Sequence, residues 1–270
     1  MEKAISQAAR NSHLELVKYL ISRISIDKLI NSNILYKALV AGANGQSREI
    51  IDYLITLSNN LKQENYYCDF PALGDLANAL NEVARVGKID LFNYILSLVG
   101  SLDNLPRALA ETIRGGNIKI IEHIFDIDPT LKTNFILNGG LYLATKNGQK
   151  QTMDYFLKSG SDWRATANDI DKILSGAASS DNKELVNYAI ALGAVNLPKA
   201  INEAINKDKL EMIKYLLING PIFKSQYSSL ILPTNADLDN ILDIITKHED
   251  LNSLKYVLLM GSDLRALLLI

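Results

Sequence analysis

The sequence has little of what stabilises or targets many secreted and membrane proteins. Cys68 is the only cysteine among 270 residues, so the chain forms no internal disulfide. Its longest uncharged runs, such as 133–145, are about half of the roughly 20 residues that a membrane helix needs. The opening residues MEKAISQAARNS include an acid at position 2 and no apolar core, unlike a signal peptide. We therefore expect a cytoplasmic protein with no membrane partner.

Charge of one sign is not in excess either. Lys and Arg number 28, Asp and Glu number 30, and the formal net charge is −2. A protein that binds nucleic acid electrostatically needs a basic excess, and no basic cluster with interleaved aromatic residues occurs in this chain. Hydrophobic residues make up 48% of the chain, which excludes a disordered protein of low hydrophobicity and high charge. The composition predicts a folded protein that does not bind nucleic acid.

Residue types that carry catalysis or hold metal ions are few and scattered. The separations of His13, His123 and His248 fit no helical pair of metal ligands. Cys68 has no neighbouring His or Lys run that would activate a nucleophile. The glycine-rich stretch 42–45 is not followed by the Gly-Lys-Ser/Thr of a phosphate-binding loop. The sequence thus predicts no catalytic, metal-binding or cofactor-binding residue, and a protein that is not an enzyme.

One aromatic position recurs along the whole chain. It lies inside short apolar stretches such as LVKYLI (16–21) and IIDYLI (50–55), and seven of the twelve tyrosines occupy it. Its members are Tyr19, Tyr53, Tyr94, His123, Tyr155, Tyr188, Tyr215 and Tyr256. Successive members lie 27 to 41 residues apart, and self-similarity at such a period indicates a repeat protein.

A second recurring position lies 14 residues before the first and is always Leu or Ile. Its members are Ile5, Leu39, Leu80, Leu109, Leu141, Leu174, Ile201 and Leu242. Small residues such as Ala8 and Ala9 mostly follow three and four positions later, which places them on the same face of a short helix. The apolar residues around Tyr19 form the stripe of a second helix. Between the two helices, Gly87 and Gly116 suit a left-handed helix end.

The pattern predicts eight helix–turn–helix repeats. They span about 3–24, 37–58, 78–100, 107–128, 139–160, 172–193, 199–220 and 240–261. The spacing varies between repeats and not inside them, as in a stack whose links differ in length. In the two shortened links, Pro106 and Pro198 start helices, with Asn104 or Asn196 close enough to cap them.

These residues resemble the ankyrin repeat family. ISQAA (5–9) matches the Leu-His-x-Ala-Ala helix of that family, and NSHLELVKYLI (11–21) matches its turn and second helix. GSD at 160–162 and at 261–263 is similar to the family's closing Gly-Ala-Asp, whereas its Thr-Pro pair is absent from every copy. The resemblance implies an all-α, ankyrin-like solenoid that spans 1–270 as one domain, with reduced or absent β-hairpin fingers.

The resemblance also implies a function. Tyrosine in place of leucine, with many Ile, Asn and Lys residues, is similar to divergent ankyrin proteins of giant viruses or intracellular bacteria, which implies a factor acting in a host cytoplasm. Ankyrin repeats imply a non-enzymatic module that binds another protein through its concave face and long inter-repeat loops. The alternatives are an effector enzyme or enzyme regulator with a site in the groove, and a structural subunit of a larger assembly.

Charged positions on the first helices predict a docking strip over the third to fifth repeats. Acidic and basic residues three positions apart would form two adjacent rows there. The strip comprises Asn81, Glu82, Arg85, Glu111, Arg114, Tyr142 and Lys146. The alternative is a solvated face whose ion pairs contribute about 0.2–0.5 kcal/mol each.

The two longest connections, 60–75 and 220–237, are a second candidate for partner binding. They contain the aromatic residues Tyr66, Tyr67, Phe70, Phe223 and Tyr227. Long loops often carry function, and aromatic residues dominate binding hot spots. The alternative is that these side chains fold back over the stack.

The apolar end RALLLI (265–270) is unusual for a terminal repeat, which normally has a polar outer face. Three interpretations follow: a tucked tail, a dimer contact through which the chain self-associates, or a further repeat that is missing.

Overall fold

The protein is all-α throughout the residues that the structure describes. The computed structural model describes residues 1–135, 139–158 and 167–234, with positions 237, 239, 241–243 and 246. Within these residues no strand forms, and one isolated β-bridge pairs Asn196 with Ile231. The predicted all-α class is therefore confirmed. The eighth predicted repeat, His248, the GSD motifs and the apolar end fall wholly or almost wholly outside the described residues.

The chain divides into two compact groups, which are described one at a time. The N-terminal half is Met1–Lys132 and the C-terminal half is Thr133–Ile270. The predicted single domain over 1–270 stays a prediction.

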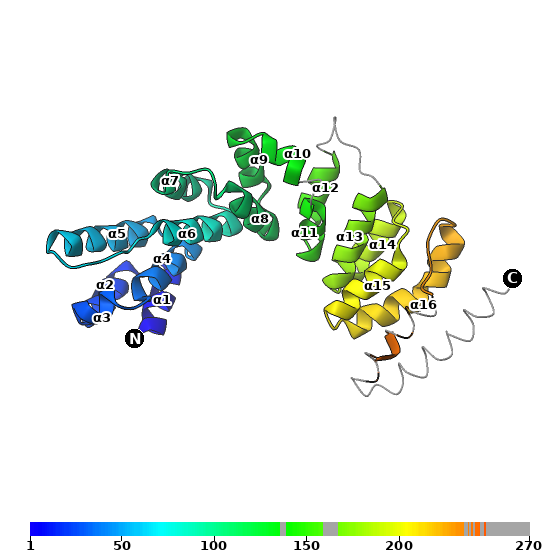
Figure 1. Cartoon of the computed structure of the whole chain (residues 1–270), viewed down its shortest axis with the longest axis horizontal. Helices are drawn as coiled ribbons and strands as arrows, with labels where there is room; N and C mark the ends of the chain where they lie inside the picture. Colours follow the sequence, from blue (N-terminus) through cyan, green and yellow to red (C-terminus); the bar gives the residue numbers. More distant parts are fainter. Residues whose placement is uncertain are drawn as a thin grey trace. The chain divides into compact units, whose positions relative to one another are not determined.

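The N-terminal half contains nine helices and the start of a tenth (Figure 1). They are α1 (Glu2–Arg10), α2 (Leu14–Ser22), α3 (Ile26–Ile30), α4 (Ile34–Asn44), α5 (Arg48–Gln63), α6 (Leu73–Val86), α7 (Ile89–Val99), α8 (Leu105–Gly115), α9 (Ile118–Ile127) and α10 (Thr130–Phe135). Helix α1 packs against α4, α4 against α6, and α6 against α8. Helices α2, α5, α7 and α9 each follow one of these and contact it.

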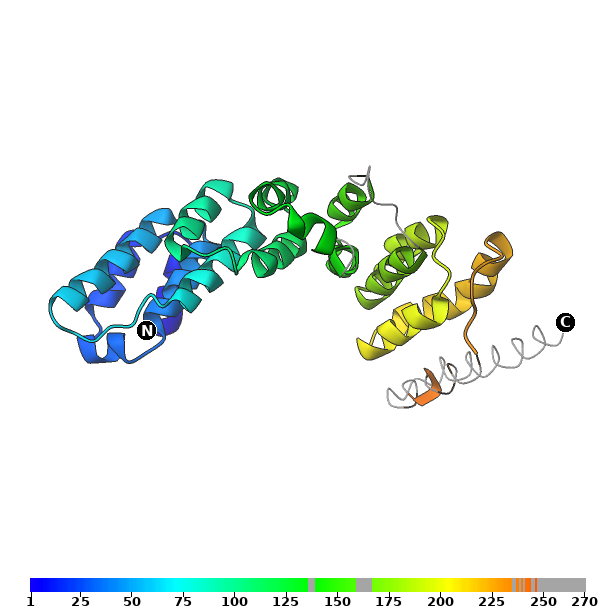
Figure 2. The same cartoon turned by 45° about the horizontal axis from the view of Figure 1, so that its top comes forward.

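The described part of the C-terminal half shows the same kind of packing (Figure 2). Its helices are α11 (Leu141–Lys146), α12 (Lys150–Lys158), α13 (Ala167–Ser179), α14 (Lys183–Ala191), α15 (Leu197–Asn206) and α16 (Leu210–Gln226). Helix α13 lies between α11 and α15 and contacts both. Each of the first seven predicted repeats therefore contains two consecutive helices. Their ankyrin-like arrangement stays a prediction.

The recurring Leu/Ile position forms the core of both halves. Ile5, Leu39, Leu80, Leu109, Leu174 and Ile201 are fully buried, and Leu141 is 1% exposed. The small residues that follow, such as Ala8 and Ala9, are also buried, which lets neighbouring first helices approach closely. Leu242 differs because it is only half-buried, while Ile241 beside it is fully buried.

Turns between the paired helices make contacts with the preceding pair. A Cβ added to Gly115 would lie 1.9 Å from the carbonyl oxygen of Arg85, and one added to Gly45 would lie 2.3 Å from that of Arg10. Asn117 Nδ2 donates to the same Arg85 oxygen at 2.7 Å. Glycine is therefore required at 45 and 115 because two backbones meet there.

Helix ends follow the sequence signals in most but not all cases. Gly87 and Gly116 end α6 and α8 with φ values of 95° and 74°, the left-handed conformation that was predicted. The Asn196 side chain caps α15 by accepting a bond from the Lys199 N–H at 3.0 Å. The Asn104 side chain makes no such bond to α8.

The recurring aromatic position links successive helix pairs through side-chain hydrogen bonds. In each link the tyrosine hydroxyl donates to the residue that immediately precedes the tyrosine of the previous pair. The links are Tyr94 to Asp52, Tyr188 to Asp154 (3.0 Å) and Tyr215 to Asn187 (2.6 Å). His123 keeps the pattern, since its Nε2 lies 2.5 Å from Asn93 Oδ1.

Cations of the previous pair cover several of the same rings. Arg48 lies 4.1 Å from the centre of the Tyr94 ring, Lys150 5.3 Å from Tyr188, Lys183 5.4 Å from Tyr215, and Lys18 5.9 Å from Tyr53. A cation over an aromatic face is attracted by the ring's quadrupole. These contacts give a physical reason for an aromatic residue at this position.

Candidate functional site

The predicted charged strip contains two ion pairs in the N-terminal half. Arg85 Nη2 donates to Glu82 Oε2 at 2.7 Å, and Arg114 pairs with Glu111 in the same way. Asn44 Nδ2 also donates to Glu82 Oε2, at 2.9 Å. Burial raises the pKa of Glu82, but the hydrogen bonds from Arg85 and Asn44 outweigh it, so the pKa lies below its usual value. Glu82 is ionised and already bound within the chain.

Asn81, another member of the strip, is buried and not on the surface. It is 6% exposed, and neither atom of its side-chain amide has a hydrogen-bond partner among the described residues. Because the Asn81 side chain is buried, it cannot contact a partner protein unless α6 moves. Its position therefore differs from those of Glu82 and Arg85 on the same helix, which are part-exposed.

Tyr142 and Lys146 belong to the C-terminal half, where they contact each other. Lys146 Nζ lies 5.4 Å from the centre of the Tyr142 ring. The Tyr142 hydroxyl donates to Glu203 Oε2 at 3.4 Å, which ties α11 to α15. Burial and the charge of Glu203 raise the pKa of Tyr142. A continuous strip over three repeats stays a prediction, because its members are described in separate halves.

The connection between α5 and α6 is fixed to α5 by its buried side chains. We call residues 64–72 the α5–α6 loop; Figures 1 and 2 show that it runs back alongside α5. The Ser58 hydroxyl, fully buried on α5, donates to the carbonyl oxygen of Phe70 and lies 3.6 Å from Cys68 Sγ. Cys68 and Phe70 are 6% and 9% exposed. Of the predicted aromatic residues, Phe70 therefore folds back onto the protein.

The other aromatic residues of this loop face solvent. Tyr67 is 87% exposed and Tyr66 is 37% exposed. Leu73, the first residue of α6, is 57% exposed and follows directly. The two interpretations of this loop therefore hold for different residues, since Phe70 anchors it while Tyr66 and Tyr67 are presented outward.

The second long connection is shorter than predicted because α16 continues through it. The helix includes Pro221 and ends at Gln226, so Phe223 lies on a helix and not on a loop. Phe223 is half-buried and its ring packs edge-on against Tyr215, with centroids 6.3 Å apart. Tyr227 is 36% exposed just after the helix. The following segment is held in place because Lys224 Nζ donates to the Leu230 carbonyl at 2.7 Å.

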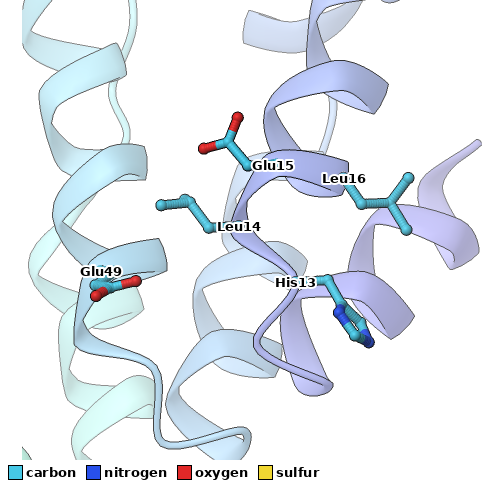
Figure 3. A pocket seen from close by; sticks show the side chains of 5 residues that line it. All are labelled: His13, Leu14, Glu15, Leu16 and Glu49. Atoms are coloured by element: carbon cyan, nitrogen blue, oxygen red, sulfur yellow. The ribbon is translucent and has the colours of Figure 1, made fainter.

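An open hollow lies where α2 and α5 begin. His13, Leu14, Glu15, Leu16 and Glu49 line it. Figure 3 shows Leu14 and Glu15 on the side of α2 that faces Glu49, whereas His13 and Leu16 point away from α5. In the described part of the chain, no group of three or more His, Cys, Asp or Glu residues is placed to hold a metal ion.

Shifted pKa values occur at the links between helix pairs. Burial, with the hydrogen bond to Asp52 and its charge, raises the pKa of Tyr94 to about 12. Burial and the hydrogen bond to Asp154 likewise raise the pKa of Tyr188. These phenols stay protonated at neutral pH and serve as hydrogen-bond donors.

Sequence reasoning missed Ser58, Leu73 and Glu203, which shape these surfaces. Ser58 lies in the polar stretch SNN (58–60), and nothing there signals its burial. Glu203 follows the same acidic column as Glu82 and Glu111, a signal that would have pointed to it. No helix within the described ranges is both long enough and apolar enough to cross a membrane. No protein-family model matches the chain, and no curated protein matches it.

Proposed function

We propose that the chain is an ankyrin-like repeat protein that binds another protein and catalyses no reaction. The observation that carries this proposal is the α5–α6 loop, which buries Cys68 and Phe70 and presents Tyr66 and Tyr67. Tyrosine is enriched in binding hot spots because it offers a large contact area and a hydroxyl with few rotatable bonds. A loop already fixed by Ser58 loses little entropy when a partner binds.

The charged strip is the second contact region of the proposal. Its ion pairs are exposed enough to contact a partner protein. Glu82 and Arg85 would then contribute to the orientation of the partner more than to the affinity. Such surface pairs contribute about 0–1 kcal/mol each, so the aromatic loop supplies most of the affinity.

The packing of the helix pairs supports the ankyrin-like part of the proposal. First helices contact first helices in succession within each half, and the links vary in length. In such a stack each pair contacts its neighbours, which leaves extended surfaces free for recognition. Tyr94 and Tyr188, whose pKa values are raised, each form a hydrogen bond between two helix pairs. This favours a structural role for them over a catalytic one.

The test is capture by the immobilised full chain from a lysate of the cells that produce it, with bound proteins quantified by mass spectrometry. The double variant Tyr66→Ala/Tyr67→Ala is compared with the unchanged chain. Leu102→Ala, which truncates another exposed apolar side chain, is the control. We expect specific proteins to be lost with the double variant alone. Failure to enrich any protein, or equal capture by all three chains, contradicts the proposal.

A further inference from the structure

Helix α2 has an exposed apolar stripe. Leu16 is 46% exposed, Tyr19 is 55% exposed, and Leu20 is half-buried between them and the core. Aligned on the recurring tyrosine, the matching residues of α5 are Ile50 and Leu54, and both are fully buried. Helix α5 has α2 beside it. The residues of α5 that match the stripe are thus covered by the protein, whereas the stripe on α2 is left exposed.

Two charges flank the stripe at equal distances from its centre. Glu15 lies four residues before Tyr19 and Arg23 four residues after it, so the three form one row along the helix, in which Glu15 lies at the edge nearer α5. The Glu15 side chain is 84% exposed, and it pairs with Lys18 at 2.7 Å on the surface. The guanidinium of Arg23 lies 4.9 Å from the centre of the Tyr19 ring. The face is acidic at one end, aromatic in the middle and basic at the other end.

We propose that this face is where two copies of the chain associate, with their α2 helices antiparallel and crossing at Tyr19. In a two-fold interface, a residue that contacts a second one is contacted in return by its counterpart. Glu15 of each copy then meets Arg23 of the other, which gives two ion pairs from one arrangement. Leu16 and Leu20 of both copies are covered at the same time.

The charge arrangement selects a second copy over an unrelated helix. An antiparallel copy brings opposite charges together at both ends, whereas a parallel copy would bring like charges together. The rows 15–19–23 and 16–20 are adjacent ridges, and each is made of residues four positions apart. Ridges of this kind pack against each other in the commonest class of helix contact. Contact between the α2 helices of two copies buries less surface than a standard interface of about 1,200–2,000 Å², so we expect a weak, reversible dimer.

The experiment is sedimentation velocity of the full chain over a concentration series from about 1 μM to 1 mM, the range in which weak complexes dissociate. We expect the mass to rise from monomer to dimer. Glu15→Arg and Arg23→Glu should each weaken association at least about tenfold, and combining them should restore it, because the swapped charges again face each other. Leu16→Glu should abolish it.

Glu49→Arg is the matched control. Glu49 occupies the position of Glu15 in the next helix pair and is exposed, but it is not part of the stripe. It should leave the mass unchanged, and circular dichroism should show every variant folded. A monomer at all concentrations overturns the proposal and leaves the stripe to a different protein. A dimer that the α2 variants do not affect, or a double variant that stays weak, also overturns it.

Discussion

The hydroxyl of Tyr188 on α14 donates a hydrogen bond to Asp154 Oδ1 on α12, at 3.0 Å and across 34 residues of sequence. The same relation joins Tyr94 to Asp52 and Tyr215 to Asn187. Each bond connects one helix pair to the one before it. Tyrosine at this position therefore contributes to the stacking of pairs as well as to the packing within a pair.

Tyr188→Phe should lower the free energy of unfolding by about 0.5–1.5 kcal/mol, because it removes the hydrogen bond and leaves half-buried Asp154 without that donor. Urea denaturation followed by circular dichroism measures the change. Tyr53→Phe is the control, since the Tyr53 hydroxyl has no hydrogen bond to another described residue. Equal losses in the two variants would show that the link to Asp154 contributes nothing.

Stability should fall as the pH rises from 10 to 12. The pKa of Tyr94 is about 12 in the folded chain, against 10 for an unperturbed tyrosine. The folded state therefore holds this proton more tightly than the unfolded state does, and the resulting stability is complete below pH 10 and lost as the pH passes 12.

The pH effect is measured as the urea midpoint in this range, for the unchanged chain and for Tyr94→Phe. The variant should lose less stability with rising pH because its ring has no proton to release. Ultraviolet absorbance of tyrosinate gives an independent titration. Tyr67→Phe, which changes an exposed ring, should keep the full fall. If Tyr94→Phe keeps it too, the phenol is not held by Asp52.

Gly115→Ala and Gly74→Ala should have opposite effects. An alanine at 115 would place its Cβ 1.9 Å from the Arg85 carbonyl oxygen, so the backbones must separate and the chain loses about 1–3 kcal/mol. Nothing lies within 4 Å of a Cβ at 74, near the start of α6, so alanine there should add about 0.4–1 kcal/mol. Thermal unfolding compares the two variants directly. Stabilisation by Gly115→Ala would contradict the close approach of the two turns.

Phe70→Ala should destabilise the chain by about 3–5 kcal/mol, because the Phe70 ring is buried and its loss leaves a cavity. Tyr67→Ala should change stability by less than about 0.5 kcal/mol, since the side chain is 87% exposed. Chemical denaturation measures both variants. A large loss in Tyr67→Ala would mean that the ring packs on the protein in solution, and it would remove the basis for the loop as a contact surface.

The helices and their buried faces could be predicted from the sequence, whereas the links between helix pairs could not. Ile5 and Leu39 repeat with small residues three and four positions on, so local periodicity places them in the core. The partner of Tyr94 is 42 residues away, and its identity depends on how the pairs stack. Ser58 illustrates the same limit, because only the return of the α5–α6 loop buries it.

The candidate surfaces divide in a similar way. Charges three apart on one helix, such as Glu82 and Arg85, pair as the spacing predicts. Asn81 is buried although it adjoins Glu82, because neighbouring helices cover that side of α6. The length of α16 was missed since Pro221 normally ends a helix, and here the helix continues past it.

The backbone contact of Gly115 with Arg85 has a consequence for how such a chain can grow. Counted from the recurring Leu/Ile position, Gly115 matches Gly45 and Arg85 matches Arg10, so the acceptor lies in the first and third hairpins and the glycine in the second and fourth. A duplicated gene segment encoding two consecutive hairpins, the first with the acceptor and the second with the glycine, would bring both halves of this joint with it. Lengthening by duplication then needs no new compensating substitution, whereas losing the glycine from one copy would strain that joint alone.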